Sequence, residues 1–165
     1  MDIRKRLSEL GIEMPAVVEP LGGYVPAVVG GDTVYVSGQL PMRDGELVAV
    51  GRVGESVSLE EAQAAARVAV VNGLAAAEWA MRRGGLLGRF ERVLRVGVFV
   101  ASGEGFTEHH RVADGASGLL AELSPGEEVR HARAAVGVSR LPLDAAVEVE
   151  LLLGLTAEGV GPELD

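Results

Sequence analysis

The sequence contains no cysteine, and aromatic residues make up only 4% of its 165 residues. Disulfides and thiolate metal sites are therefore excluded, and the reducing cytoplasm is the expected location. With so few aromatic rings, Ala, Val, Leu and Gly must supply most of the interior, within a hydrophobic fraction of 48%. We therefore expect a core that is packed tightly from small side chains.

Basic residues are also scarce, since the formal net charge is −9 and Lys5 is the only lysine. The arginines are dispersed along the chain, which disfavours nucleic acid as a partner because phosphate-binding proteins gather positive charge on one surface. No apolar run approaches the roughly 20 residues that cross a bilayer. The basic N-terminus lacks the apolar segment of a secretory signal. We therefore expect neither membrane insertion nor export.

The length of 165 residues fits a single domain, which we predict over residues 1–165. A short helix over residues 2–10 looks like an appendage that occupies 1–14, and residues 154–165 should form a loose tail. The remaining elements follow the order ββαβαββ. They are hairpin strands within 24–38, a helix capped by Ser58 and closing at Arg83, a strand over 93–101, a helix ending before Pro125, and strands over 132–139 and 145–153.

This order favours an α+β fold with one mixed sheet and both long helices on one face, because a doubly wound sheet needs more helices. The other face would stay uncovered although it carries apolar residues. Association between subunits would cover it. We therefore predict a homo-oligomer.

A candidate chemical site lies on the last two predicted strands. Strand side chains alternate, so Arg133 faces away from Val136, and Glu148 and Glu150 face away from Val149. If the two strands pair and their valines meet in the core, Arg133 and both glutamates lie together on the non-core face.

Small neighbours make Arg133 a candidate clamp for a small acid, because Ala135 and Gly137 on the same face leave room for a ligand. The guanidinium offers two parallel donors that match the two oxygens of a carboxylate. A glutamate nearby could position or deprotonate a water for hydrolysis. Spacing alone does not choose between Glu148 and Glu150. The alternative is a cross-strand ion pair between Arg133 and one of these glutamates.

No metal, nucleotide or serine-nucleophile site is predicted. His109 and His110 are adjacent and would point in different directions on a helix, while His131 is distant in sequence. The glycine pairs lack the spacing of a phosphate loop, and Ser37 lacks the surroundings of a nucleophile elbow.

Several segments together resemble the RidA/YjgF family in order and spacing over residues 24–153. They are Tyr24-Val25-Pro26-Ala27-Val28, Val36-Ser37-Gly38-Gln39-Leu40-Pro41, His131-Ala132-Arg133, Arg140-Leu141-Pro142 and Val147-Glu148-Val149-Glu150. The resemblance implies a chorismate-mutase-like fold and a homotrimer with three clefts between subunits. It also implies hydrolysis of reactive enamines or imines, such as 2-aminoacrylate, to 2-keto acids and ammonia without a cofactor. The N-terminal helix is similar to that of the longer branch of the family.

The same resemblance implies roles for individual residues. Arg133 would hold the substrate carboxylate and Glu148 would help to activate the attacking water. The other pocket residues would be Tyr24, Ser37, Gly38, His110 and the backbone of Ala135. Family members often have cysteine at the position of Ala135 and asparagine at that of His110. These differences keep open a non-catalytic trimeric binder or sensor of small carboxylates. The ribonuclease or translation-inhibitor role of some relatives is disfavoured by the acidic balance.

Overall fold

The computed structural model describes residues 3–17, 23–86, 90–124 and 130–156. Its main feature is a five-stranded sheet with the strand order β1-β2-β7-β5-β6. The strands are β1 (Ala27–Gly30), β2 (Thr33–Gln39), β5 (Phe90–Ala101), β6 (Ala132–Val138) and β7 (Val147–Leu155). A small separate hairpin, which the sequence pattern did not predict, consists of β3 (Met42–Arg43) and β4 (Glu46–Leu47).

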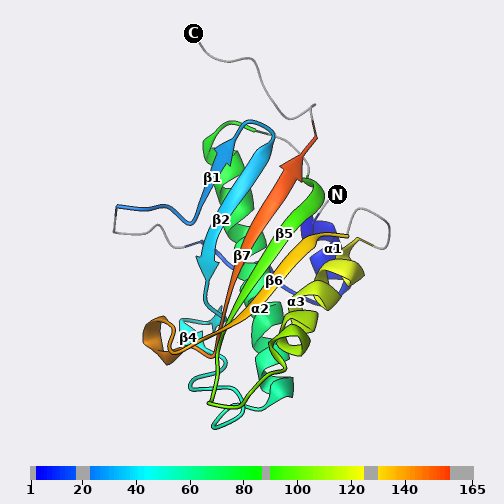
Figure 1. Ribbon diagram of the computed structural model, residues 1–165. Coiled ribbons are helices and arrows are strands. Elements are labelled where there is room, and N and C mark those ends of the chain that lie inside the picture. The colour runs from blue at the N-terminus through cyan, green and yellow to red at the C-terminus, as the bar shows by residue number, and fades with distance from the viewer. Residues whose placement is uncertain (1–2, 18–22, 87–89, 125–129, 157–165) are drawn as a thin grey trace.

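Helices cover one face of this sheet, as Figure 1 shows. The helices are α1 (Ile3–Glu9), α2 (Leu59–Arg83) and α3 (His109–Leu123), and a 3₁₀ turn occupies Pro142–Asp144. Helix α2 packs on β1, β2 and β7, while α3 packs on β5 and β6. The predicted mixed α+β fold, with the two long helices on one face, is thus confirmed. No helix in the described ranges is both long and apolar enough to cross a membrane.

Helix α2 begins and ends where its sequence predicts. The hydroxyl of Ser58 accepts a hydrogen bond from the backbone of Glu61, whose carboxylate accepts one from the backbone of Ser58. Small residues then let the helix approach its neighbours. A Cβ on Gly73 would lie 2.8 Å from Leu151 in the sheet, and one on Gly115 of α3 would lie 2.3 Å from the carbonyl oxygen of Gln63. Helix α2 therefore packs too closely against the sheet and against α3 for larger side chains at these positions.

The pairing of β6 corrects the prediction for the last two strands. These strands do not pair, because β6 lies parallel to β5, and β5 separates it from β7. Arg133 pairs with Val96, whose side chain is fully buried, so Arg133 lies on the face covered by helices. Val136 lies on the uncovered face instead. The prediction that Arg133 shares the non-core face with Glu148 and Glu150 is therefore wrong for a single chain.

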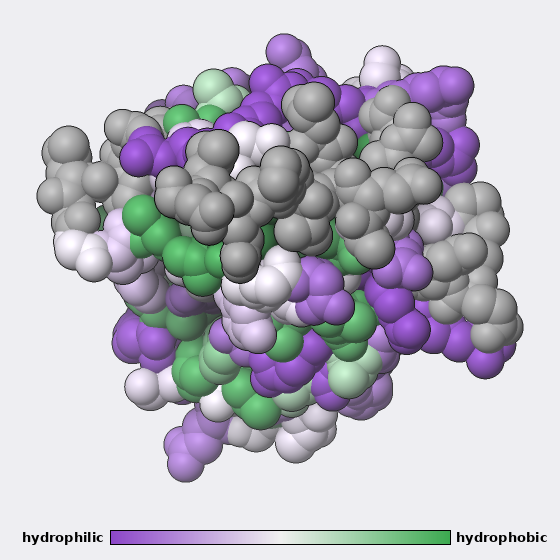
Figure 2. All heavy atoms as spheres, turned by 90° about the horizontal axis from the view of Figure 1, so that it is seen from above, coloured by the Kyte–Doolittle hydropathy of each residue, from purple (hydrophilic) through white to green (hydrophobic). Residues whose placement is uncertain are grey.

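The uncovered face carries apolar side chains, as predicted. Val28, Tyr35 and Val136 are 49%, 49% and 45% exposed. The register pairs Val28 with Tyr35 and Tyr35 with Leu152, so these residues form a row across β1, β2 and β7. Seen from above, hydrophobic residues also reach the surface among hydrophilic ones (Figure 2). Covering the uncovered face would remove this apolar surface from water.

Helix α1 is part of the core, which corrects its description as an appendage. Leu7 is fully buried and Ile3 nearly so. Arg6 donates through Nε to the carbonyl oxygen of Leu123 at 3.0 Å and through Nη2 to that of Glu122 at 3.3 Å. These carbonyls belong to the last turn of α3, where helices lack internal donors. Helix α1 therefore both fills the core and caps α3.

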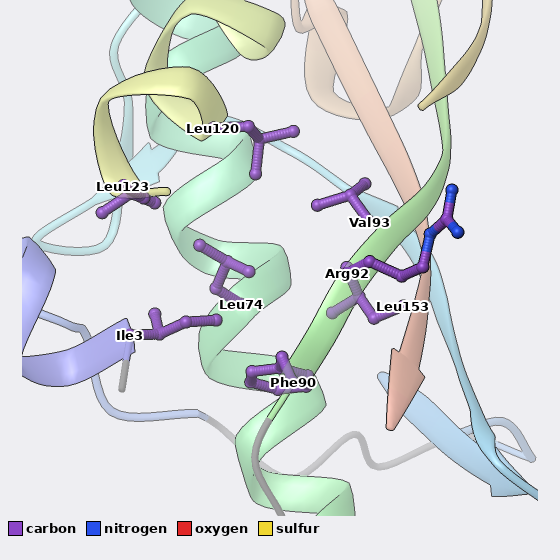
Figure 3. Close-up of a pocket in the computed structure, with 8 residues that line it drawn as sticks. All are labelled: Ile3, Leu74, Phe90, Arg92, Val93, Leu120, Leu123 and Leu153. Atoms are coloured by element: carbon purple, nitrogen blue, oxygen red, sulfur yellow. The ribbon is translucent and has the colours of Figure 1, made fainter. Parts of the chain in front are cut away.

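A small cavity of about 10 Å³ remains where α1, α2, α3 and β5 meet (Figure 3). Its lining is almost wholly apolar and includes Ile3, Leu74 and Phe90. This space is about the minimum that one water needs, and a water also needs polar partners. The cavity is therefore a packing gap and not a substrate site.

The C-terminal boundary differs slightly from the prediction. Strand β7 continues to Leu155, so the first residues of the predicted tail over 154–165 belong to the sheet. Residues 157–165 lie outside the described residues, as do Pro125 and Gly126 beyond α3.

Replacing Leu7 with alanine should lower the free energy of unfolding by about 2–5 kcal/mol, because the substitution opens a gap in the core. Leu10 is 41% exposed, so Leu10→Ala should change it by less than about 0.5 kcal/mol. Urea denaturation of both variants at one protein concentration measures the difference. Equal stability of the two variants would contradict the place of α1 in the core.

Candidate functional site

Arg133 lies in a polar cluster between β6 and α3. Its Nη1 donates to Oδ1 of Asp114 at 2.8 Å and to the hydroxyl of Ser117 at 3.1 Å. The same hydroxyl lies 3.0 Å from Nε2 of His131. The Arg133 side chain is 28% exposed. We call Arg133, Asp114, Ser117 and His131 the arginine cluster.

Helix periodicity explains how α3 supplies this cluster. Asp114 and Ser117 are three residues apart and therefore share one side of α3. His110 lies four residues before Asp114, so the exposed His110 belongs to the same side, one turn nearer the helix start. Ala135 pairs with Val98 and shares the face of Arg133. The structure thus brings the predicted residues His110 and Ala135 to the side of Arg133.

Glu148 lies on the opposite, uncovered face of the sheet, above Gly38. A Cβ on Gly38 would lie 1.7 Å from Oε1 of Glu148, so the glycine provides the space that the carboxylate occupies. The hydroxyl of Ser37 donates to the carbonyl oxygen of Val25 at 2.9 Å and holds the segment of the exposed Tyr24 beside β2. We call Tyr24, Ser37, Gly38 and Glu148 the glutamate surface.

The two candidate glutamates have different surroundings. Glu150 forms an ion pair with Arg95, so the ion pair that was the alternative for Arg133 is made by a different arginine. Glu148 forms no hydrogen bond or ion pair with the described part of the chain. Burial raises the pKa of the Glu148 carboxyl, and the negative charge of Glu150 raises it further. Of the two glutamates, only Glu150 is thus engaged by an arginine among the described residues.

The arginine cluster and the glutamate surface do not meet within one chain. Strand β5 lies between β6 and β7, and neighbouring strands are about 4.8 Å apart, so the two backbones are separated by about 10 Å. Arg133 and Glu148 also point to opposite faces of the sheet. A molecule as small as 2-aminoacrylate cannot contact both side chains of the same chain.

A third polar contact involves His109, at the first residue of α3. Its Nε2 lies 2.9 Å from the hydroxyl of the buried Ser102. A Cβ on Gly137 would lie 2.5 Å from the same nitrogen, so only glycine fits there. This contact ties the start of α3 to the end of β5. Among the described residues, no three His, Asp or Glu side chains gather in a way that could hold a metal ion.

Comparisons with known proteins extend these observations over nearly the whole chain. Residues 4–155 match the family described as "YjgF/chorismate mutase-like, putative endoribonuclease". Protein TCP17 of Trypanosoma cruzi is 44% identical over 154 residues, which cover 93% of this chain and 94% of that protein.

Solved structures give the same picture. Atu1372 of Agrobacterium tumefaciens, a protein of unknown function, is 42% identical with a TM-score of 0.79, covering 93% of this chain and 91% of that one. A "putative endoribonuclease" of Shewanella oneidensis is 32% identical with a TM-score of 0.81, covering 92% of this chain and 97% of that one. The matched region runs from α1 to the end of β7 and so includes both halves of the candidate site.

Glu148 should titrate at a higher pH than Glu122, whose pKa is lowered by its hydrogen bond to Arg67. A carbon-detected NMR titration of the side-chain carboxyls, with Glu148→Gln for assignment, measures both midpoints. A midpoint of Glu148 at or below that of Glu122 would contradict the effect of burial.

The raised pKa of Glu148 also determines the direction in which the stability of the fold changes with pH. The folded state binds the Glu148 proton more tightly than the unfolded chain, so this contribution to stability is lost as the pH rises from about 4 through the folded pKa. Glu148→Gln should therefore remove this loss and unfold at a higher denaturant concentration than wild type at pH 7.

Proposed function

The chain belongs to the YjgF/chorismate mutase-like family, and we propose that it hydrolyses small reactive enamines or imines that carry a carboxylate. The class includes 2-aminoacrylate and its tautomer 2-iminopropionate, and the products are a 2-keto acid and ammonia. Arg133 holds the carboxylate and Glu148 assists the attacking water, without a cofactor. The observation that supports this proposal most is the partly exposed guanidinium of Arg133 between α3 and β6, beside the small residue Ala135.

The reaction in this proposal needs one group that moves protons. Glu148 takes one proton from the water as the water oxygen bonds to C2 of the imine, and passes this proton to the imine nitrogen, which gives a carbinolamine. Glu148 then takes the hydroxyl proton and passes it to the same nitrogen, the carbonyl forms as the C2–N bond breaks, and ammonia leaves. A carboxylate whose pKa is raised toward the working pH exchanges protons more effectively than an ordinary one.

We further propose that the site is completed between subunits of a homotrimer. Because Arg133 and Glu148 lie on opposite faces of their own sheet, Arg133 of one subunit would face Glu148 of the next. The row of Val28, Tyr35 and Leu152 on the uncovered face supports this assembly, since its burial removes apolar area from water.

A second candidate function is the binding of small carboxylates without turnover. Ala135 and His110, which differ from the residues common in the family, favour it, because both lie on the side of Arg133. The ribonuclease activity in the names of the family and of the Shewanella relative is the third candidate. A net charge of −9 argues against binding a polyanion. Incubation with RNA at low salt tests the third candidate, and absence of RNA cleavage would exclude it.

Arg133→Ala should slow the hydrolysis of 2-aminoacrylate, generated in situ, by about 100-fold, because charge-assisted hydrogen bonds to the carboxylate are lost. Formation of the keto acid above the spontaneous rate is the measurement. Arg82→Ala removes an exposed arginine that pairs with Glu78 on α2 and should leave the rate unchanged. An Arg133→Ala variant as fast as wild type would refute the role. Binding of 2-oxobutyrate without turnover of any imine would favour the second candidate.

Mixed trimers should test the shared site directly. Arg133→Ala and Glu148→Gln should each be about 100-fold or more slower than wild type when tested alone. Co-refolding them in equal amounts should restore about a quarter of the wild-type activity, because in a randomly assembled ring a quarter of the clefts combine an intact Arg133 with an intact Glu148. If both residues acted within one chain, mixing would restore nothing.

A further inference from the structure

We propose that Asp114 and Ser117 are positioning residues, which hold the Arg133 guanidinium in an orientation that leaves one of its edges open to the substrate. This inference rests on the proposed role of Arg133 as the carboxylate clamp. It adds the binding mode, which is side-on through Nε and Nη2, and the two residues that impose it.

The hydrogen count of the guanidinium leads to this binding mode. Nη1 carries two hydrogens, and two acceptors lie within hydrogen-bond distance of it, Asp114 at 2.8 Å and Ser117 at 3.1 Å. Both hydrogens of Nη1 are thereby used. A carboxylate that bound end-on would need one hydrogen from each of Nη1 and Nη2. The parallel N–H bonds of Nε and Nη2 are the remaining pair that fits two carboxylate oxygens.

The position of Ser117 is itself held from two sides. Its hydroxyl oxygen accepts from Arg133 and lies 3.0 Å from Nε2 of His131, two residues before Arg133. The oxygen has two lone pairs and one hydrogen, so it can serve both partners in either tautomer of the imidazole. Ser117 of α3 thus contacts both His131 and Arg133, and these two contacts hold α3 at a fixed distance from this segment of the chain.

Asp114 acts on a bound anion in two opposing ways. Its hydrogen bond holds the guanidinium in one orientation, which favours binding because less side-chain freedom is lost when the carboxylate arrives. Its negative charge repels that carboxylate. The Asp114 side chain is 56% exposed, so water and salt screen the repulsion. We expect orientation to be the larger effect.

Substitutions at position 114 separate the two effects. Asp114→Asn keeps an oxygen that can accept from Nη1 but removes the charge, whereas Asp114→Ala removes both. Titration calorimetry with 2-oxobutyrate should show a Kd about 5–10-fold weaker for Asp114→Ala, the order expected when one long side chain is no longer restrained before the ligand binds. Asp114→Asn should bind as tightly as wild type or more tightly. Ser117→Ala should weaken binding in the same direction as Asp114→Ala.

A matched control is available on the same helix. Glu122 of α3 forms a two-pronged ion pair with Arg67 on α2, away from β6, so Glu122→Ala removes a comparable ion pair and should leave the Kd unchanged. Binding by Asp114→Ala that equals or exceeds wild-type binding would overturn the proposal, since Asp114 would then only compete with the ligand. Failure of wild type to bind 2-oxobutyrate would overturn the clamp and this inference together.

A second readout does not depend on any ligand. In wild type the Nη1 hydrogens of Arg133 should give separate, slowly exchanging NMR signals, because two acceptors restrain rotation about the Cζ–Nη1 bond. Asp114→Ala should merge them, and Arg133→Lys assigns them. If wild type hydrolyses no imine but the variants at position 114 show the expected order of Kd values, the proposed hydrolytic activity is wrong and the positioning role stands. If hydrolysis proceeds and Asp114→Ala changes neither signals nor Kd, the positioning role fails alone.

Discussion

In β6, Arg133 is paired with Val96 of β5, and this parallel register determines the surroundings of the candidate site. The pairing turns Arg133 toward α3, where Asp114 and Ser117 supply acceptors. A shift of one residue would turn Arg133 to the uncovered face and bring Val136 to the face that α3 covers. The crossover through α3 thus supplies both the strand that carries the arginine and the helix that holds it.

Glycine residues make these contacts possible, because they have no side chain to fill the space. Gly115 lets α3 lie against the backbone of α2 while α3 also packs on β5 and β6. Gly38 provides the space for the carboxylate of Glu148, and Gly137 provides that for the ring of His109. A composition rich in alanine and glycine is therefore a condition for the site as well as for the core.

Much of the fold could be predicted from local patterns. The capping box at Ser58 fixed the start of α2, and the order of strands and helices fixed a sheet covered on one side. Strand pairing could not be predicted in this way, because alternation shows which residues share a face but not which face is covered. In β6 one set contains Val136 and Val138 and the other contains Arg133 beside small residues, so alternation favoured the valines for the core. The polar pair Asp114 and Ser117 was visible at helical spacing, but its meaning depended on the pairing of β6.

Because Arg133 and Glu148 lie on opposite faces of the sheet, the charged form of Glu148 is poorly stabilised within its own chain. On one chain its carboxylate is half-buried without a cation among the described residues, and Glu150 adds a like charge. In the proposed cleft, Arg133 of the next subunit stays hydrogen-bonded to Asp114 of its own chain, and a substrate carboxylate seated on Arg133 would offset the rest of its charge. Burial and the charge of Glu150 would then still keep the pKa of Glu148 raised, which suits a group that has to take a proton from water.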